Sequence, residues 1–237
     1  MSKQLNKRKN VFVSGLVIMG LGLFGAVNSA NAGGEEKTGG AAVKAEQPAF
    51  LNYDMVLGDK NAPIEIIEYA STTCPHCARF HADILPQIKE KYVKTGKVKI
   101  VYRNFIFDNP FDIYASTLTR CVSEKKFFPT LALYFKRQHS WVKGKEVGEV
   151  YRQYGKDAAY GFVKGEVGKI AKLTGMKQEA IDACFSNPEV QSYLMKLRVD
   201  AVKQYEVNST PTVIVDGKKV DNYSFETIEE AIKATGK

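Results

Sequence analysis

The chain has 237 residues with a hydrophobic content of 44%, and its 34 basic and 26 acidic side chains give a net charge of +8. The basic residues are scattered and form no long block, which excludes the charge pattern of a nucleic-acid-binding protein. The length suits one main domain, and no internal repeat is present.

The first residues have the pattern of an export signal. Basic residues precede an apolar stretch over residues 11–27, and Ala30 and Ala32 supply the small residues that a signal peptidase recognises. We therefore predict a cleaved signal peptide over residues 1–32, with an uncleaved membrane anchor as the alternative. Its four basic residues would be lost on cleavage, which leaves 30 − 26 = +4.

The next segment lacks the side chains of a folded core. Residues 33–48 are rich in glycine, alanine, lysine and glutamate and contain no aromatic residue. They cannot bury much surface, so we predict a flexible linker. The chain is regularly apolar from residue 49 to residue 237, which predicts one domain over 49–237.

The domain begins with a strand, a helix and a second strand. Residues 64–69 are dense in β-branched and apolar side chains, which predicts a buried strand. Apolar residues then recur at steps of three and four, as on one face of a long helix, and Pro86 predicts a kink in it. Residues 98–104 predict the next strand. Two strands joined through a helix are expected to be parallel.

Helical patterns dominate residues 108–186, where strand patterns fade, and we predict a helical insert there. Its helices are expected near residues 113–124, 129–138, 147–154, 162–173 and 178–185.

The last part of the domain returns to mixed structure. Asn187 and Pro188 predict the start of an amphipathic helix. Residues 211–220 predict a strand, a tight turn and a second strand, and Ser224 caps a closing helix. The expected fold is α/β, with a βαβ half, the helical insert and an αββα half.

The motif Cys74-Pro75-His76-Cys77 follows the first strand, where the helix begins. Free backbone N–H groups and the helix dipole favour a thiolate at Cys74, and the thiolate is the nucleophile in disulfide exchange. Pro75 suits a first helical turn. His76 can carry positive charge or donate a hydrogen bond toward the Cys74 sulfur. A stabilised reduced form makes the disulfide form a strong oxidant.

The motif has two other interpretations, a structural disulfide and a zinc site. A structural disulfide is disfavoured because a two-residue spacing closes too small a loop to stabilise the fold. A zinc site could use Cys74, Cys77 and His81, with Cys121 or Cys184 as the fourth ligand. No second Cys-x-x-Cys is present, and export favours oxidation. We therefore predict a redox pair and expect neither a metal nor a cofactor.

The four cysteines allow three pairings on paper. Cys74 and Cys77 are close neighbours, and the other two stand far along the chain. The simple pairing is therefore Cys74–Cys77 with Cys121–Cys184.

A second candidate element is Thr210-Pro211, at the start of the late strand, where proline is tolerated. A cis bond there would form a tight bend beside the cysteines, and the Thr210 backbone could pair with an extended substrate peptide. An ordinary trans proline is the alternative.

The segment from Glu68 to Cys77, together with Thr210-Pro211 and the helical insert, resembles the DsbA family of periplasmic disulfide oxidoreductases. The Pro-His pair between the cysteines is specific, because thioredoxins themselves typically carry Gly-Pro there. The resemblance implies a thioredoxin-like fold, disulfide exchange at Cys74, a buried partner thiol in Cys77 and a cis-proline loop at Thr210–Pro211.

The resemblance also assigns a role to Glu68, as a buried acid that relays protons to or from Cys77. A strand residue facing solvent is the alternative, because neighbouring strand positions alternate between faces. Cys121 and Cys184 depart from the family pattern, although similar extra cysteines pair in some alphaproteobacterial relatives. Their disulfide is predicted to be a structural staple, with tuning of the redox potential as the alternative.

The resemblance predicts a dithiol oxidase in the periplasm. It would donate the Cys74–Cys77 disulfide to reduced or unfolded exported polypeptides, and a quinone-linked membrane oxidase of the DsbB type would restore it. We expect a monomer that binds no nucleic acid. A disulfide isomerase and a zinc-binding or chaperone-type binding module are the alternative functions, and an inner-membrane anchor facing the periplasm is the alternative location.

Overall fold

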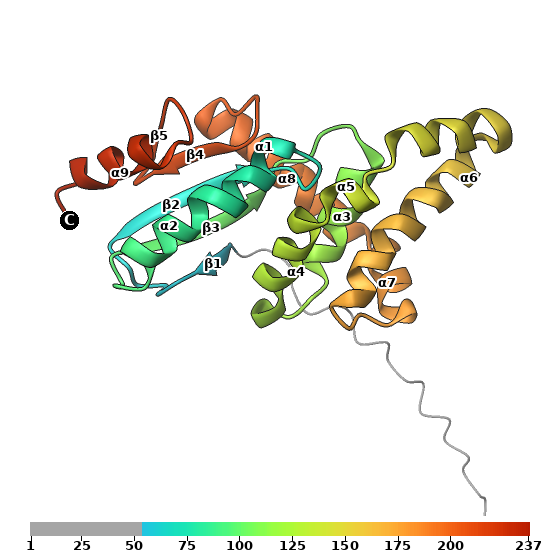
Figure 1. Ribbon diagram of the computed structural model, residues 1–237, viewed down its shortest axis with the longest axis horizontal. Helices are drawn as coiled ribbons and strands as arrows, with labels where there is room; N and C mark the ends of the chain where they lie inside the picture. Colours follow the sequence, from blue (N-terminus) through green and yellow to red (C-terminus); the bar gives the residue numbers. More distant parts are fainter. Residues whose placement is uncertain (1–53) are drawn as a thin grey trace, which may run out of the picture. The chain divides into compact units, whose positions relative to one another are not determined.

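The computed structural model describes residues 54–237, in which a five-stranded sheet carries helices on both faces (Figure 1). The predicted signal peptide, the predicted linker and the first residues of the predicted domain lie outside the described residues. The sheet order is β1-β3-β2-β4-β5. The strands are β1 (Met55–Leu57), β2 (Ile64–Ala70), β3 (Val98–Asn104), β4 (Thr212–Val215) and β5 (Lys218–Lys219).

The centre of the sheet has the predicted parallel pair. β2 and β3 run parallel, with Glu68 opposite Tyr102, and β4 pairs antiparallel with the other side of β2. The strand β1 was not predicted; its three residues pair antiparallel with β3. Because β2 lies between two strands and is covered on both faces, its side chains are almost all buried.

The chain from Pro75 to Val93 is helical throughout, in four consecutive segments. These are α1 (Pro75–Arg79), the π-helical η1 (Phe80–Ile84), α2 (Leu85–Ile88) and the π-helical η2 (Lys89–Val93). Pro86 lies in the first turn of α2, between the two π-helical segments. A proline lacks the N–H of a regular helix, and the wider turns on either side accommodate it.

The predicted helical insert is confirmed and fills the chain between β3 and α8. Its helices are α3 (Pro110–Arg120), α4 (Glu124–Lys136), α5 (Gln138–Trp141), α6 (Gly144–Leu173) and α7 (Gln178–Phe185). The prediction that a helix begins at Pro129 is wrong, because Pro129 lies inside α4. The two helices predicted at 147–154 and 162–173 correspond to the two helical stretches of α6, which meet at a kink where the Gly155 backbone is not helical. Gly155 has a φ of 82°, which only glycine adopts without strain.

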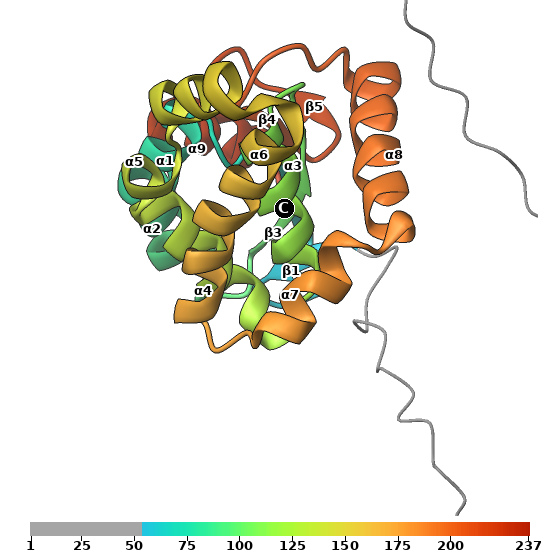
Figure 2. The same cartoon turned by 90° about the vertical axis from the view of Figure 1, so that its right-hand side faces the viewer.

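The closing elements have the predicted caps. The Asn187 side chain accepts a hydrogen bond from the Glu189 N–H at the start of α8 (Pro188–Tyr205), and Ser224 accepts one from the Thr227 N–H at the start of α9 (Phe225–Ala234). Figure 2 shows α8 on one side of the sheet and α1, α2 and α9 on the other.

Each face of the sheet has its own apolar core. Ile66, Ile100 and Val213 face the helical run α1–η2 and α9 in one cluster, and Ile67, Val101 and Ile214 face α8 in another. Alternate residues of one strand point to opposite faces, so neighbours such as Ile66 and Ile67 enter different cores. The strand β2, whose carboxyl end leads to the cysteines, is therefore packed on both faces.

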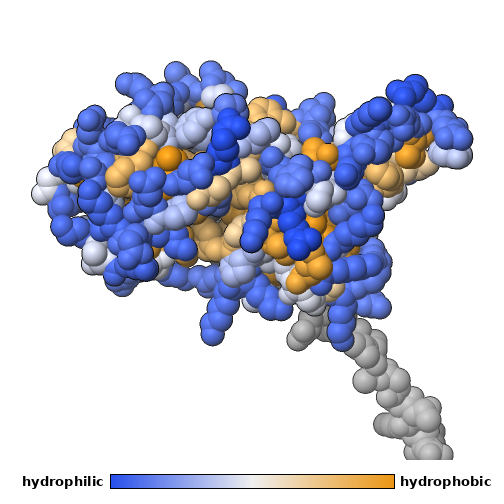
Figure 3. Space-filling model, in the orientation of Figure 1, coloured by the Kyte–Doolittle hydropathy of each residue, from blue (hydrophilic) through white to orange (hydrophobic). Residues whose placement is uncertain are grey.

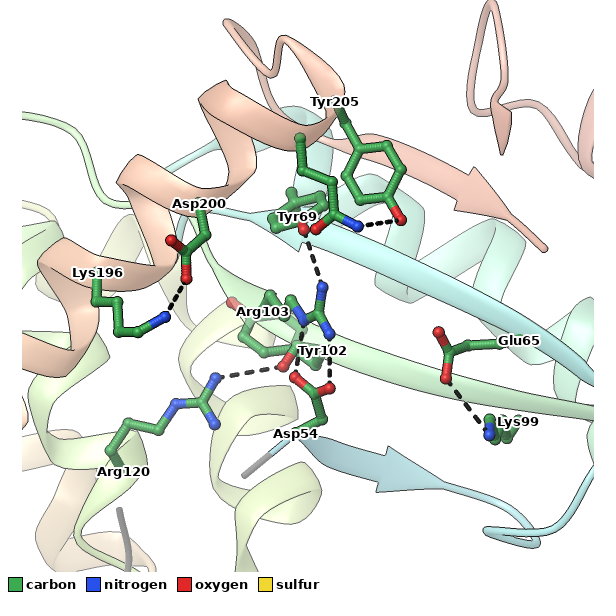
Figure 4. A network of polar contacts seen from close by, with 11 residues as sticks. Asp54, Glu65, Tyr69, Lys99, Tyr102, Arg103, Arg120, Lys196, Asp200 and Tyr205 are labelled. Atoms are coloured by element: carbon green, nitrogen blue, oxygen red, sulfur yellow. Dashed lines mark hydrogen bonds and ion pairs between the residues drawn. The ribbon is translucent and has the colours of Figure 1, made fainter. Parts of the chain in front are cut away.

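A polar network lies on the α8 face (Figure 4). The Arg103 guanidinium donates to both carboxylate oxygens of Asp54, at 2.7 and 2.6 Å, and to the Tyr69 hydroxyl at 3.0 Å. Arg120 is fully buried nearby and donates to the Tyr102 carbonyl and to the Asn104 side chain. The bidentate ion pair between Arg103 and Asp54 links β3 to the residue just before β1.

The described surface is polar in character. On the face seen in Figure 3, hydrophilic side chains cover most of the outer helices, and apolar surface gathers where the helical insert meets the sheet. From Asp54 to the C-terminus, no helix combines the length and the apolar character needed to cross a bilayer.

The helical insert carries a disulfide between Cys121, at the end of α3, and Cys184, in α7. It closes a loop with a sequence separation of 63 residues. Cross-linking a loop of this size restricts the unfolded chain and contributes about 4 kcal/mol in the chain-entropy model.

The double substitution Cys121→Ala with Cys184→Ala is therefore expected to lower the free energy of unfolding by about 4 kcal/mol. Urea denaturation of both proteins, with Cys74 and Cys77 kept reduced, measures the difference. Equal stability of the two proteins would contradict a structural role for this disulfide.

Candidate active site

The two cysteines of the Cys-x-x-Cys motif sit at the carboxyl end of β2, where α1 begins. Cys74 is the N-cap of α1, with an extended backbone, and Pro75 is the first residue of the helix. Both cysteines are free thiols, so the structure describes the dithiol form. Cys74 is partly exposed, whereas Cys77 is completely buried. Only Cys74 can therefore meet a protein substrate.

The Cys74 sulfur is surrounded by groups that stabilise its anion. Its pKa is lowered to about 5, chiefly by the hydrogen bond from the Cys77 thiol, with burial opposing the shift. The Thr210 side chain and the backbone N–H groups of Cys77 and His76 lower it further. Cys74 is therefore a thiolate at neutral pH.

Cys77 has the opposite character. Burial raises its pKa well above the ordinary value, and the neighbouring Cys74 and Glu68 raise it further. A buried thiolate beside two negative groups is unfavourable, so Cys77 keeps its proton when Cys74 has lost its own. The two sulfurs therefore have different roles: Cys74 is the nucleophile, and Cys77 is its protonated partner.

Thr210-Pro211, distant in sequence, lies against the cysteines. The Thr210–Pro211 peptide bond is cis, and the Thr210 carbonyl accepts a hydrogen bond from the Cys74 thiol at 3.3 Å. That contact belongs to the protonated thiol, because a thiolate has no hydrogen to donate. The loop is continuous with β4, which pairs with β2 and so brings it to the same sheet end as Cys74.

The His76 side chain forms its hydrogen bonds with two other side chains. Its imidazole Nδ1 lies 2.6 Å from the Tyr223 hydroxyl and 2.8 Å from the Arg79 guanidinium, on the exposed rim of the site. An arginine only donates, so Nδ1 acts as the acceptor in that contact. Toward Cys74 it is the backbone N–H of His76, and not the ring, that lowers the sulfur's pKa.

Glu68 is buried, with 1% of its surface exposed, so the solvent-facing alternative is wrong. Both of its carboxylate oxygens lie near the Nε2 atom of His81, at 2.9 and 3.1 Å. His81, considered above as a zinc ligand, thus has a carboxylate partner instead. From residue 54 onward, no group of three or more His, Cys, Asp or Glu side chains is placed to hold a metal ion.

Two residues of the helical insert hold the active-site loop, and neither was predicted. Asp112 of α3 accepts from the Thr72 N–H at 2.8 Å, from the Thr72 hydroxyl at 2.7 Å and from the Phe107 N–H at 2.9 Å. Gln138 of α5 donates its amide to the carbonyls of Thr72 and Cys74, at 2.8 and 3.0 Å. Neither had a signal in the sequence: Asp112 precedes the helix expected from residue 113, and Gln138 ends the helix expected over 129–138.

The thioredoxin family model matches residues 51–234 of the chain. The chain belongs to the thioredoxin family.

Relatives of the chain carry names that refer to disulfide exchange. A Rickettsia conorii protein that is named a protein-disulfide oxidoreductase is 31% identical over 200 residues, which cover 83% of this chain and 66% of that protein. A Rickettsia bellii protein of the same name is 33% identical over 180 residues, covering 76% of this chain and 63% of that protein. The chain thus spans slightly less than two thirds of these relatives.

Solved structures agree on the fold. Wolbachia pipientis alpha-DsbA1 superimposes with a TM-score of 0.64 at 27% identity, over 78% of this chain and 91% of that one. A protein-disulfide isomerase from Novosphingobium aromaticivorans gives a TM-score of 0.68 at 24% identity, over 78% of this chain and 98% of that one. The chain is therefore a DsbA-like member of the thioredoxin family, with a thioredoxin-like fold and an inserted helical region.

In this thioredoxin-family protein the low pKa of Cys74 has a measurable consequence. Thiolate absorbance in the ultraviolet is expected to titrate with a midpoint near pH 5 in the dithiol form and to vanish in Cys74→Ala. A lowered pKa stabilises the folded dithiol form most above the ordinary thiol pKa, and this contribution is lost as the pH falls through 5. A midpoint near pH 9 would contradict the assignment.

Proposed function

We propose that this protein is a thiol–disulfide oxidoreductase that works as a dithiol oxidase. The observation that carries the proposal is the division between a stabilised Cys74 thiolate and a protonated, buried Cys77. Interactions that stabilise the reduced form favour passing the disulfide to another protein. The names of the Rickettsia relatives support the same class of reaction.

The reaction is a pair of exchanges. A substrate thiolate attacks the Cys74 Sγ of the oxidised enzyme, the Cys74–Cys77 bond breaks, and its electron pair leaves on Cys77, which takes up a proton. A second substrate thiolate then attacks the substrate sulfur of the mixed disulfide. Cys74 leaves as the stabilised thiolate. The substrate loses two electrons, and the enzyme pair gains them.

A groove beside Cys74 provides a place for the substrate chain. It has a volume of about 430 Å³ and is lined by His76, by the loop 208–213 and by residues 219–223. Backbone groups of the Thr210 loop are suited to pair with an extended peptide, and side chains such as Tyr223 offer adjustable polar contacts. Such a groove fits many polypeptides rather than one small molecule.

The expected substrates are reduced polypeptides exported from the cell. The expected reoxidant is a quinone-linked membrane oxidase of the DsbB type, and the expected location is the periplasm. The name of a Bacillus subtilis relative, disulfide bond formation protein D, accords with the oxidising direction.

Two refolding assays distinguish the oxidase from an isomerase. The oxidised protein is expected to introduce disulfides into reduced ribonuclease A rapidly, and the reduced protein is expected to unscramble mispaired ribonuclease A poorly. Strong unscrambling with weak oxidation would assign the chain to isomerisation. Aggregation suppression that survives substitution of both active-site cysteines would instead favour a chaperone.

A further inference from the structure

The imidazole of His81 is almost completely buried, one helical turn beyond Cys77. It projects from η1 toward β2, where Nε2 lies 2.9 Å from the nearer carboxylate oxygen of Glu68. The Phe135 ring of α4 packs against it with centroids 4.3 Å apart. Only 7% of the His81 side chain and 1% of the Glu68 side chain are exposed.

We propose that His81, through Glu68, is the buried group that exchanges the proton of Cys77. This inference deepens the proposed function and rests on it. The reaction requires such a group, because Cys77 changes between disulfide sulfur and protonated thiol in each cycle while remaining inaccessible to water. Glu68 alone would be a buried acid without a compensating cation, which is costly.

The proton balance follows the oxidation step. In the proposed cycle, the His81–Glu68 pair holds one transferable proton before substrate attack. When Cys77 leaves as a thiolate, Nε2 gives its proton to Glu68, and Glu68 gives a proton to the Cys77 sulfur. The products are a Cys77 thiol, a Glu68 carboxylate and a neutral imidazole. Reoxidation runs the same transfer backward, so the pair stores the proton between the two half-reactions.

The other groups around the pair cannot take this role. Tyr102 of β3 has its pKa raised well above the ordinary value by burial and stays a neutral phenol. Phe80 and Phe135 are apolar, and Arg120, which donates to the Tyr102 carbonyl, does not release a proton. The Cys74 thiolate is the exchanging sulfur itself.

The test measures the reaction of Cys74 and the later reaction of Cys77 as two separate steps. Glutathione disulfide is added to the reduced protein, and Cys74 forms a mixed disulfide with one glutathione. Cys77 then loses its proton and attacks Cys74, which releases the second glutathione. The closing rate is measured against pH. The rate of Cys74 alkylation by iodoacetamide reports the first cysteine alone, because that reaction involves no proton of Cys77.

His81→Gln keeps an N–H donor for Glu68 but cannot carry the proton. It is expected to slow closure about 10-fold or more at pH 7, with alkylation unchanged within about twofold. His139→Gln is the matched control, because this exposed histidine of α5 undergoes the same chemical change away from Glu68. In His81→Ala, which leaves room for a free base, added imidazole is expected to restore part of the closing rate.

Combination with Glu68→Gln supplies a second criterion. If the two residues form one relay, the double variant is expected to close no more slowly than the slower single variant. Closure at the wild-type rate in His81→Gln would overturn the inference, as would equal slowing of closure and alkylation. Failure of the proposed function would give a different result from failure of this inference, because the wild-type protein itself would then not oxidise ribonuclease A.

Discussion

Replacing Cys74 with serine is expected to abolish dithiol oxidation, with a loss of at least about 1,000-fold in rate. Cys74 carries the only partly exposed sulfur of the pair, and its thiolate is stabilised by the Cys77 thiol, the Thr210 side chain and two backbone amides. A serine hydroxyl is not ionised at neutral pH and forms no disulfide. The measurement is the oxidation of reduced ribonuclease A by the purified variant.

Cys77→Ser serves as the matched control for this substitution. It also prevents the internal disulfide, but it leaves the Cys74 thiolate free to form a mixed disulfide with a substrate. We expect mixed disulfides to accumulate in Cys77→Ser and to be absent in Cys74→Ser, as seen by mass spectrometry without reductant. Full oxidase activity in Cys74→Ser, or mixed disulfides through Cys77, would refute the assignment.

The difference between the two cysteines follows from the fold. The end of β2 and the start of α1 place one sulfur at the helix N-cap and the other one turn inside, under the α4 side of the core. The burial of Cys77 was implied by the resemblance to the DsbA family. The spacing and the preceding strand predicted the position at the helix start, because two intervening residues put both cysteines on the first turn. The parallel β2–β3 pair and the helical insert were predictable for the same reason: each depends on a local pattern.

What the sequence could not predict depends on contacts between distant positions. Asp112 binds Thr72 across a separation of 40 residues, and Gln138 binds Cys74 across 64. A periodicity indicates which face of a helix is buried, but not which buried polar group it meets there. The direction of the His76 ring was missed for a similar reason, since its partner Tyr223 is 147 residues away.

The identity of the Glu68 partner lies between these cases. His81 follows Cys77 by one helical turn, and the motif placed it near the site as a candidate zinc ligand. Its pairing with Glu68 required knowledge of which face of β2 lies toward η1. Glu68 alternates along β2 with Ile64 and Ile66, which pack against the helical run α1–η2, and this alternation places it on the η1 face. The sequence thus placed His81 near the site without identifying Glu68 as its partner.

Asp112→Ala is expected to lower the free energy of unfolding by about 3–5 kcal/mol and to disturb the active-site loop. The Asp112 carboxylate is fully buried and accepts from two backbone N–H groups and one hydroxyl. Alanine would leave the Thr72 and Phe107 N–H groups without this acceptor, and the Thr72 hydroxyl would keep only the Asp112 backbone carbonyl, at 3.4 Å. Burial raises the pKa of Asp112, and hydrogen bonds from Phe107, Thr72 and Ser71 oppose the shift.

The consequence for the site follows from Thr72, whose carbonyl also accepts from Gln138. Losing Asp112 releases one side of the loop that positions Cys74, so slower alkylation of Cys74 should accompany the loss of stability. Asp108→Ala, at an exposed aspartate between β3 and α3, is the matched control. Urea unfolding and iodoacetamide kinetics measure the two effects. If Asp112→Ala matches the control within about 0.5 kcal/mol, the helical insert does not hold the active-site loop through this carboxylate.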